Sequence, residues 1–159
     1  MNYHLLLREK VKRMDRIVEL TLYPDVRSKV NELVKTEAYQ GFTYFITFNR
    51  LGIPCAYVEI PQSHELYEVD YENIELDAKY APNWNLTFSG SQLHPQYTLN
   101  TGWFIGWDYG HCTDCVKPDF GGDFFNGRVW STEEIEAECH KVIDALKGHH
   151  YGIEGQNGN

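Results

Sequence analysis

The chain has 159 residues, 42% of them hydrophobic and 14% aromatic, which is enough for one domain with a single core and no disulfide staples. Its formal net charge is −9 and is unevenly spread. Residues 1–35 hold eight Lys and Arg against five Asp and Glu, whereas residues 36–159 hold six against 18. Such an acidic body repels phosphate backbones, so we expect no direct nucleic-acid binding. The acidic residues either form a solvated surface that only keeps the protein soluble, or form a surface that binds a basic partner.

The start of the chain does not have the pattern of a signal peptide or a membrane span. Its first apolar run, Leu5–Leu7, is far too short for either. We therefore expect a cytoplasmic protein with reduced thiols and no membrane association. The four cysteines are unevenly spaced, which argues against a secreted disulfide framework.

The N-terminal third is predicted to contain an arm, a strand and a helix. Residues 1–13 are basic and could form a short helix or an arm. Ile17–Tyr23 alternates between apolar and polar residues, which predicts a strand. Pro24-Asp25 opens a predicted amphipathic helix that runs to about Thr36. Its apolar stripe consists of Val26, Val30, Leu33 and Val34.

The middle of the chain reads as strands and turns. Phe42–Phe48 and Ile53–Ile60 alternate on either side of a glycine-containing connection, which predicts a hairpin. Residues 62–73 read as a loop, and residues 74–76 as a short strand. Trp84, Leu86 and Phe88 alternate in the next predicted strand. A further strand is predicted over residues 102–107, with polar residues directly after it.

The last predicted element is an amphipathic helix that starts after Ser131. Ser131 and Glu134 have the spacing of a capping box, and Gly148 is suited to the position after the helix. The apolar stripe consists of Ile135, Cys139, Val142, Ile143 and Leu146. Residues 149–159 have little to bury and are predicted to be a mobile tail.

These elements predict one α+β domain over residues 1–148, with an antiparallel β-sheet and two flanking amphipathic helices. The alternation of strands and helices that gives a parallel sheet is missing from the pattern.

Polar residues after the strand at 102–107 suggest a metal site. Asp108, His111 and Asp114 have ligand side chains, and His64 could complete the set. A divalent ion held this way would activate a water for hydrolysis, with Asp108, His111 and Asp114 as catalytic candidates. The alternative is that both Asp side chains cap the turn and that His111 forms a hydrogen bond within it.

A second suggestion comes from Cys112-x-x-Cys115. This pair could be half of a zinc site that stabilises a structural module, or a redox pair. A second Cys-x-x-Cys is missing, and Cys139 fits the apolar stripe of its helix. Aromatic side chains, among them Tyr67, Trp84 and Tyr109, could stack on a nucleotide or simply fill the core and its rim.

Four segments, in this order along the chain, carry a resemblance to a known family. They are Ala-Tyr-Val-Glu-Ile-Pro-Gln-Ser-His-Glu-Leu-Tyr (56–67), Leu-Thr-Phe-Ser (86–89), Trp-Phe-Ile-Gly-Trp-Asp-Tyr-Gly-His-Cys-Thr-Asp (103–114) and Glu-Cys-His-Lys-Val-Ile-Asp-Ala-Leu (138–146). Together they resemble a family of small bacteriophage and prophage proteins whose activity is not established. The resemblance leaves out the basic N-terminal third. It implies a phage-type context rather than a reaction.

The chain departs from the family pattern at one place. Where that pattern has His-Gly-Gly before Leu-Thr, this chain has Pro82-Asn83-Trp84-Asn85. If the histidine belongs to a reactive site in the family, that site is altered here, which disfavours an enzyme.

The resulting first hypothesis is a phage-type accessory protein that acts by binding, for example by inhibiting a host defence component. Its target would be a host protein that itself binds nucleic acid, or a small nucleotide held among aromatic side chains. Its candidate binding residues are His64, Tyr67, Trp84, Asp108, Tyr109 and His111. The alternatives are the metal-dependent hydrolase and the zinc-stabilised module. No cofactor is favoured, and zinc or another divalent metal belongs to the alternatives.

Overall fold

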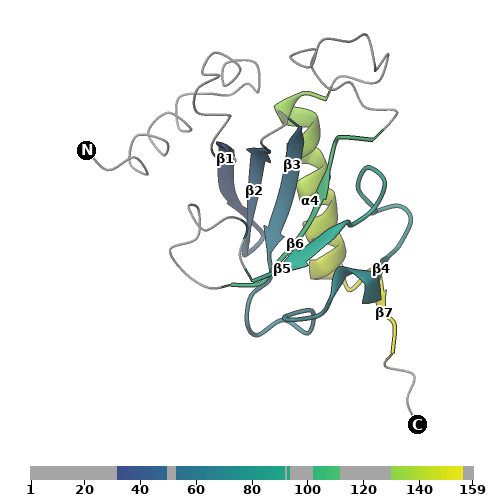
Figure 1. The fold of residues 1–159 in the computed structure, drawn as a ribbon. Helices are drawn as coiled ribbons and strands as arrows, with labels where there is room; N and C mark the ends of the chain where they lie inside the picture. Colours follow the sequence, from purple (N-terminus) through teal and green to yellow (C-terminus); the bar gives the residue numbers. More distant parts are fainter. Residues whose placement is uncertain (1–31, 50–52, 92, 94–101, 112–129, 156–159) are drawn as a thin grey trace.

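The computed structural model of the chain describes residues 32–49, 53–91, 93, 102–111 and 130–155, and the other residues are drawn as a grey trace in Figure 1. The predicted arm at 1–13, the strand at 17–23 and most of the helix at 25–36 lie outside these ranges. Cys112, Asp114 and Cys115 also lie outside them.

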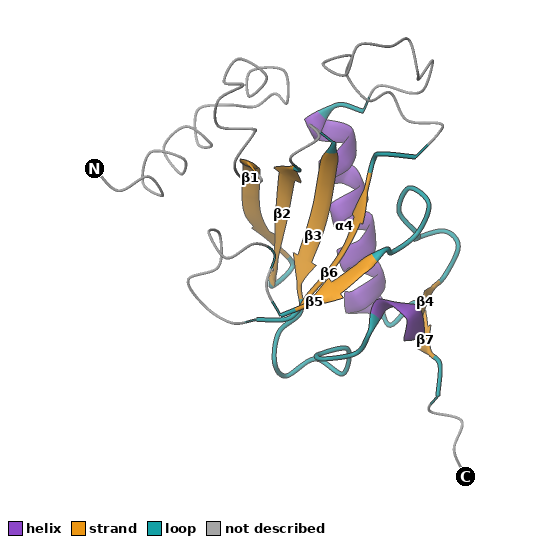
Figure 2. Ribbon diagram, in the orientation of Figure 1, coloured by secondary structure: helices purple, strands orange, loops and turns teal. Residues whose placement is uncertain are grey.

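An antiparallel sheet forms the body of the domain. Its strand order is β1-β2-β3-β6-β5. The strands are β1 (Glu32–Tyr39), β2 (Phe42–Phe48), β3 (Pro54–Glu59), β6 (Phe104–Asp108) and β5 (Phe88–Gly90). Helix α4 (Thr132–Gly148) lies across one face of this sheet (Figures 1 and 2). The class is therefore α+β with an antiparallel sheet, as the sequence predicts.

A second, two-stranded sheet lies beside the first. It consists of β4 (Ile74–Leu76) and β7 (Tyr151–Ile153), and a 3-10 turn, η1 (Tyr71–Asn73), leads into β4. The short strand predicted at 74–76 is thus confirmed. Within the described ranges, no helix is long and apolar enough to span a membrane.

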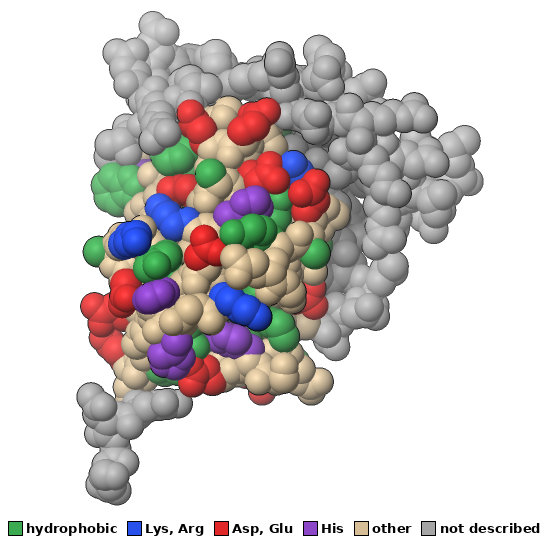
Figure 3. All heavy atoms as spheres, turned by 180° about the vertical axis from the view of Figure 1, so that it is seen from behind, with side chains coloured by type: hydrophobic (Ala, Val, Ile, Leu, Met, Phe, Trp, Pro, Cys, Tyr) green, Lys and Arg blue, Asp and Glu red, His purple; other side chains and the backbone are tan. Residues whose placement is uncertain are grey.

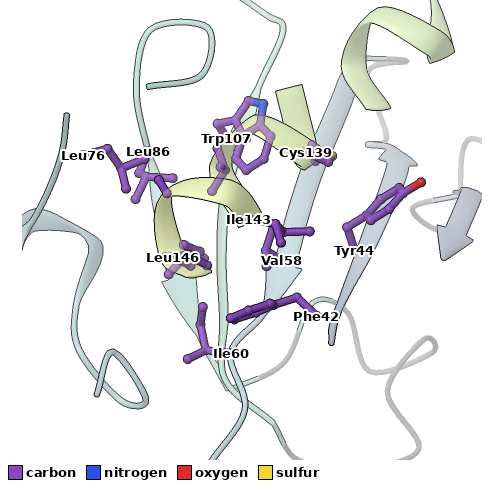
Figure 4. Close-up of a cluster of buried hydrophobic side chains, with 14 of the residues drawn as sticks. Phe42, Tyr44, Val58, Ile60, Leu76, Leu86, Trp107, Cys139, Ile143 and Leu146 are labelled. Atoms are coloured by element: carbon purple, nitrogen blue, oxygen red, sulfur yellow. The ribbon is translucent and has the colours of Figure 1, made fainter. Parts of the chain in front are cut away.

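The core lies between the sheet and α4. Alternate residues of β2 and β3 point into it, and the predicted apolar stripe of α4 is buried against them (Figure 4). The hairpin and the second helix are therefore confirmed. Full burial of one such aliphatic or aromatic side chain stabilises the fold by about 1.5–3 kcal/mol.

The start of α4 has the predicted capping box. The backbone N–H of Glu134 donates to Ser131 Oγ at 3.2 Å, and the backbone N–H of Ser131 donates to Glu134 Oε2 at 3.4 Å. The other end differs from the prediction. Gly148 is still helical, and His149 is the left-handed residue, with φ 57°. Contacts of the His149 ring with Glu65 and Tyr151 stabilise this conformation.

The prediction of a helix over residues 25–36 is wrong for its last five residues. Residues 32–36 lie in β1, which pairs with β2 from Glu32↔Phe48 to Tyr39↔Phe42. The register shifts between Leu33 and Lys35, which adds one residue to the strand. This irregularity breaks the period-two alternation, so the segment reads as a helical stripe. The described part of the chain thus shows one of the two expected flanking helices.

The predicted mobile tail is also wrong for residues 151–153. They form β7, whose partners in β4 run from Ile74↔Ile153 to Leu76↔Tyr151. Tyr151 is 7% exposed, and Ile153 packs against the core. A three-residue strand is too short for periodicity to reveal it, and its pairing partner is distant in sequence.

The strand predicted through Trp84, Leu86 and Phe88 is shorter than expected. It begins only at Phe88, because Trp84 and Asn85 have φ values of 57° and 71°. Left-handed residues cannot continue an extended strand. As a result the two side chains do not share one face: Leu86 is buried in the core and Trp84 is exposed on the surface.

Candidate binding site

The residues predicted to form a site are divided between two ends of the sheet. Asp108 pairs with Cys55 at one end of β3 and β6, and Phe104 pairs with Glu59 at the other. His64 lies in the turn that follows the Glu59 end. The rise of a strand separates Cys55 from Glu59 by about 13 Å. His64 is therefore separated from Asp108 and His111, so the described members of the predicted four-residue metal site do not come together. Asp114, the fourth member, lies outside the described ranges.

His64 links the turn after β3 to the end of α4. Its Nδ1 accepts a hydrogen bond from the backbone N–H of Leu66 at 3.2 Å. Its Nε2 lies 3.4 Å from the carbonyl oxygen of Leu146. A neutral ring with its proton on Nε2 satisfies both contacts. Because both nitrogens face backbone groups, His64 has no lone pair directed at a metal ion.

Asp108 caps the turn after β6, which is one part of the predicted alternative to a metal site. Asp108 Oδ1 accepts from the backbone N–H of Gly110 at 2.9 Å and lies 3.8 Å from His111 Nδ1. Among the described residues, no group of three or more His, Cys, Asp or Glu side chains could hold a metal ion. The metal hypotheses that use Asp114, Cys112 or Cys115 stay predictions, since those residues are outside the described ranges.

The two described cysteines are buried thiols. Burial, followed by the nearby Asp108 carboxylate, raises the pKa of Cys55 to about 12. Burial also raises the pKa of Cys139 well above its usual value. Both thiols are thus held in the protonated form, whereas zinc binds the thiolate form.

Trp84 and His111 form a stacked pair at the end of β6. Their ring centroids are 4.9 Å apart and their planes differ by 4°. Trp84 is 56% exposed, and it is the one large hydrophobic side chain exposed to this degree in the part of the chain that the structure describes. Of the predicted binding residues, Trp84, Asp108 and His111 thus come together.

The backbone under Trp84 is strained and is fixed on both sides. A left-handed conformation costs a residue such as Trp about 1–2 kcal/mol. The backbone N–H of Asn83 donates to Glu138 Oε2 at 3.2 Å, and the backbone N–H of Leu86 donates to Asn85 Oδ1 at 2.8 Å. These bonds stabilise a turn that presents the indole outward.

Tyr109 supports this site from inside the core and is not itself a contact surface. It is 1% exposed. Its hydroxyl donates to Glu138 Oε2 at 2.5 Å and accepts from Trp107 Nε1 at 2.9 Å. Burial, and then the Glu138 carboxylate, raise the pKa of Tyr109 well above its usual range, so it remains a donor. The same Glu138 oxygen therefore fixes both Tyr109 and the turn that carries Trp84.

Tyr67 lies in the same turn as His64. It is half-buried against the core, and its backbone N–H donates to the His64 carbonyl oxygen at 3.0 Å. Glu138 is not among the predicted site residues, because its role depends on three segments that meet only in the folded chain. Its one sequence signal is its place beside Cys139, at the border of the apolar stripe of α4.

Comparisons of this chain with protein-family models, with curated proteins and with solved structures give no match.

Proposed function

We propose that this chain acts by binding a partner protein with a basic surface, and that Trp84 is the anchor of the contact. The observation that carries the proposal is the exposed indole on a fixed support. Tryptophan is enriched among the residues that dominate protein–protein binding energies. A side chain already held by stacking on His111 and by a fixed turn loses little freedom on binding.

The acidic excess of the described residues indicates which class of partner fits this chain. The described residues include 16 Asp and Glu against four Lys and no Arg. Acidic side chains are exposed along the loop after β3 and through β4, at Glu65, Glu68, Asp70, Glu72, Glu75 and Asp77. Such a field speeds association with a positively charged protein and repels phosphate-bearing ligands. It supports a protein target over the nucleotide alternative.

The proposal extends to a bacterial host, which is the context that the resemblance to phage proteins implies. A host protein that binds nucleic acid has a basic surface of this kind. An acidic accessory protein would inhibit it by occupying that surface. The Trp84 turn is where this chain departs from the family pattern. The proposal therefore concerns a contact particular to this chain.

The test is quantitative capture of a host protein by the tagged chain. Bacterial lysate is passed over immobilised wild-type protein, Trp84→Ala and Trp84→Phe, with the exposed Glu75→Gln as a control away from the Trp84 turn. The proposal predicts a basic protein on the wild type, loss of at least tenfold with Trp84→Ala, and partial retention with Trp84→Phe. Equal recovery on wild type and Trp84→Ala contradicts it.

A further inference from the structure

A groove of about 550 Å³ opens at the other end of the domain from Trp84. Its walls come from the β1–β2 turn, the turn after β3, the end of α4 and β7. Its volume is in the range of small-molecule sites. Figure 3 shows that histidine side chains gather on the α4 side of the molecule, among acidic and basic ones.

The floor of the groove is apolar and aromatic. Phe42, Leu146 and Tyr151 line it and are 6%, 3% and 7% exposed. Figure 4 shows Phe42 and Leu146 at the end of the core away from Trp107. The His64 ring meets Phe42 edge-on at 5.6 Å, and the His149 ring lies 4.6 Å from that of Tyr151. Aromatic rings bind alkyl groups by apolar contact, and their faces attract cations.

Glu65 supplies the charge at the rim. Its Oε1 accepts from the Tyr151 hydroxyl and lies 2.9 Å from His149 Nδ1. Within the described residues, Oε2 has no hydrogen-bond or ion-pair partner, and the side chain is 45% exposed. Burial, and then Glu65 itself, raise the pKa of Tyr151 well above its usual range, so its hydroxyl keeps the proton that it donates.

The end of α4 adds to this field. The C-terminal end of a helix carries partial negative charge from its last carbonyl groups, and it disfavours anions. Lys147 is the opposing charge on the rim. It is exposed, and its flexible stem allows the ammonium group to turn into solvent. The groove therefore combines an apolar floor with a rim that carries one carboxylate, Glu65, one ammonium group, Lys147, and the imidazole rings of His64 and His149. Glu65 Oε2 is the anionic atom that a ligand can reach.

We infer that this groove binds an organic cation, a primary ammonium or guanidinium group on an alkyl stem. The charged group pairs with Glu65 and the end of α4, and the stem lies over Phe42 and Leu146. A free amine and a Lys or Arg side chain of a protein offer the same chemistry. The inference is independent of Trp84, which has no atom in this groove.

The experiment is an NMR titration of the full, uniformly ¹⁵N-labelled chain. The probes are pentylamine, the neutral pentanol, the anionic pentanoate and N-acetyl-lysine methylamide. Saturable shifts confined to the residues of the groove are expected for the amines, with at least tenfold weaker binding of pentanol and pentanoate. Absence of saturable shifts with either amine, or equal binding of pentanol, overturns the inference.

Variants test the assigned groups. Glu65→Gln is expected to weaken amine binding roughly tenfold, since it removes a charge-assisted hydrogen bond. Glu75→Gln removes an exposed carboxylate outside the groove and is expected to leave binding unchanged, as is Trp84→Ala. If Glu65→Gln does not fold, the inference is tested on the wild-type chain alone, by comparing the affinity for pentylamine with that for pentanol. Equal weakening by Glu65→Gln and Glu75→Gln contradicts a local site.

The two amines separate the sources of the ligand. Tighter binding of the blocked lysine assigns the groove to a side chain of a protein, and tighter binding of pentylamine assigns it to a free amine. Either result supports the organic-cation site.

Discussion

Glu138 of α4 and Tyr109 of the segment after β6 meet in a 2.5 Å hydrogen bond, and the same carboxylate oxygen accepts the backbone N–H of Asn83. Helix, sheet and surface turn are thus joined at one atom. Lys141 lies 3.7 Å from the other oxygen of Glu138 and completes the charge pair. This relationship explains how Trp84 can be exposed and yet held in one place.

The first prediction concerns that junction. Glu138→Ala leaves the Tyr109 hydroxyl and the Asn83 N–H without their acceptor, and it is expected to lower the free energy of unfolding by about 2–4 kcal/mol. Glu138→Gln keeps one amide oxygen and should cost less. Urea denaturation measures both, with the exposed Glu75→Gln as control. A loss with Glu138→Ala no larger than that of the control would show that the junction is not stabilising.

The second prediction concerns the left-handed turn. At an ordinary strand or helix position, glycine is less stable than alanine by about 0.5–1 kcal/mol. At position 84 we expect the reverse, with Trp84→Gly more stable than Trp84→Ala by about 1 kcal/mol, because φ is 57° there. Thermal and urea unfolding of the two variants check it. Glu75→Gly and Glu75→Ala in β4 are the matched pair and should show the ordinary order.

The third prediction concerns the close approach of two strands. A Cβ at Gly106 would lie 2.4 Å from Tyr57 Cδ1 and 2.8 Å from the Ala56 carbonyl oxygen. Gly106→Ala is therefore expected to destabilise the fold by about 1–3 kcal/mol. Gly152→Ala, also in a strand, meets nothing within 4 Å and should be nearly neutral. Equal unfolding midpoints for the two variants would contradict this packing.

The fourth prediction concerns alkaline pH. The pKa of Cys55 is raised to about 12 in the folded chain by burial and by Asp108, from an ordinary value of 9.0. Above pH 9 the unfolded chain therefore loses this proton while the folded chain keeps it. The stability from the protonated thiol falls by about 1.4 kcal/mol per pH unit until about pH 12. Urea unfolding with reductant at pH 8 to 10.5 should show a shallower decline for Cys55→Ala than for wild type. Parallel declines would contradict the shift.

The sequence predicted the elements whose signals are local. The hairpin of β2 and β3 follows from the alternation in each strand around a glycine-containing connection. Helix α4 follows from its apolar stripe and its capping box. β1 is not predicted because a one-residue register shift interrupts its alternation of apolar and polar residues. β7 is not predicted because a strand of three residues is too short to show an alternation. Both strands are determined by their pairing partners, β2 and β4.

Local sequence signals also predict only part of the candidate site. Trp84, Asp108 and His111 could be singled out as residue types, and two of them stack in the fold. Their separation from His64 depends on which end of β3 each segment follows, a property of the sheet register. Glu138, Glu65 and His149 act across long sequence distances, so no local pattern indicates them.

The most direct test of the binding proposal is photo-crosslinking from position 84. The chain with benzoylphenylalanine in place of Trp84 is expressed in bacteria, the cells that the proposal names, and irradiated. The same group at the exposed Glu75 is the control. We expect one discrete adduct with a basic host protein from position 84, and a far weaker one from position 75. No protein adduct from position 84, or the same adducts from both positions, would contradict the proposal that Trp84 anchors a protein partner.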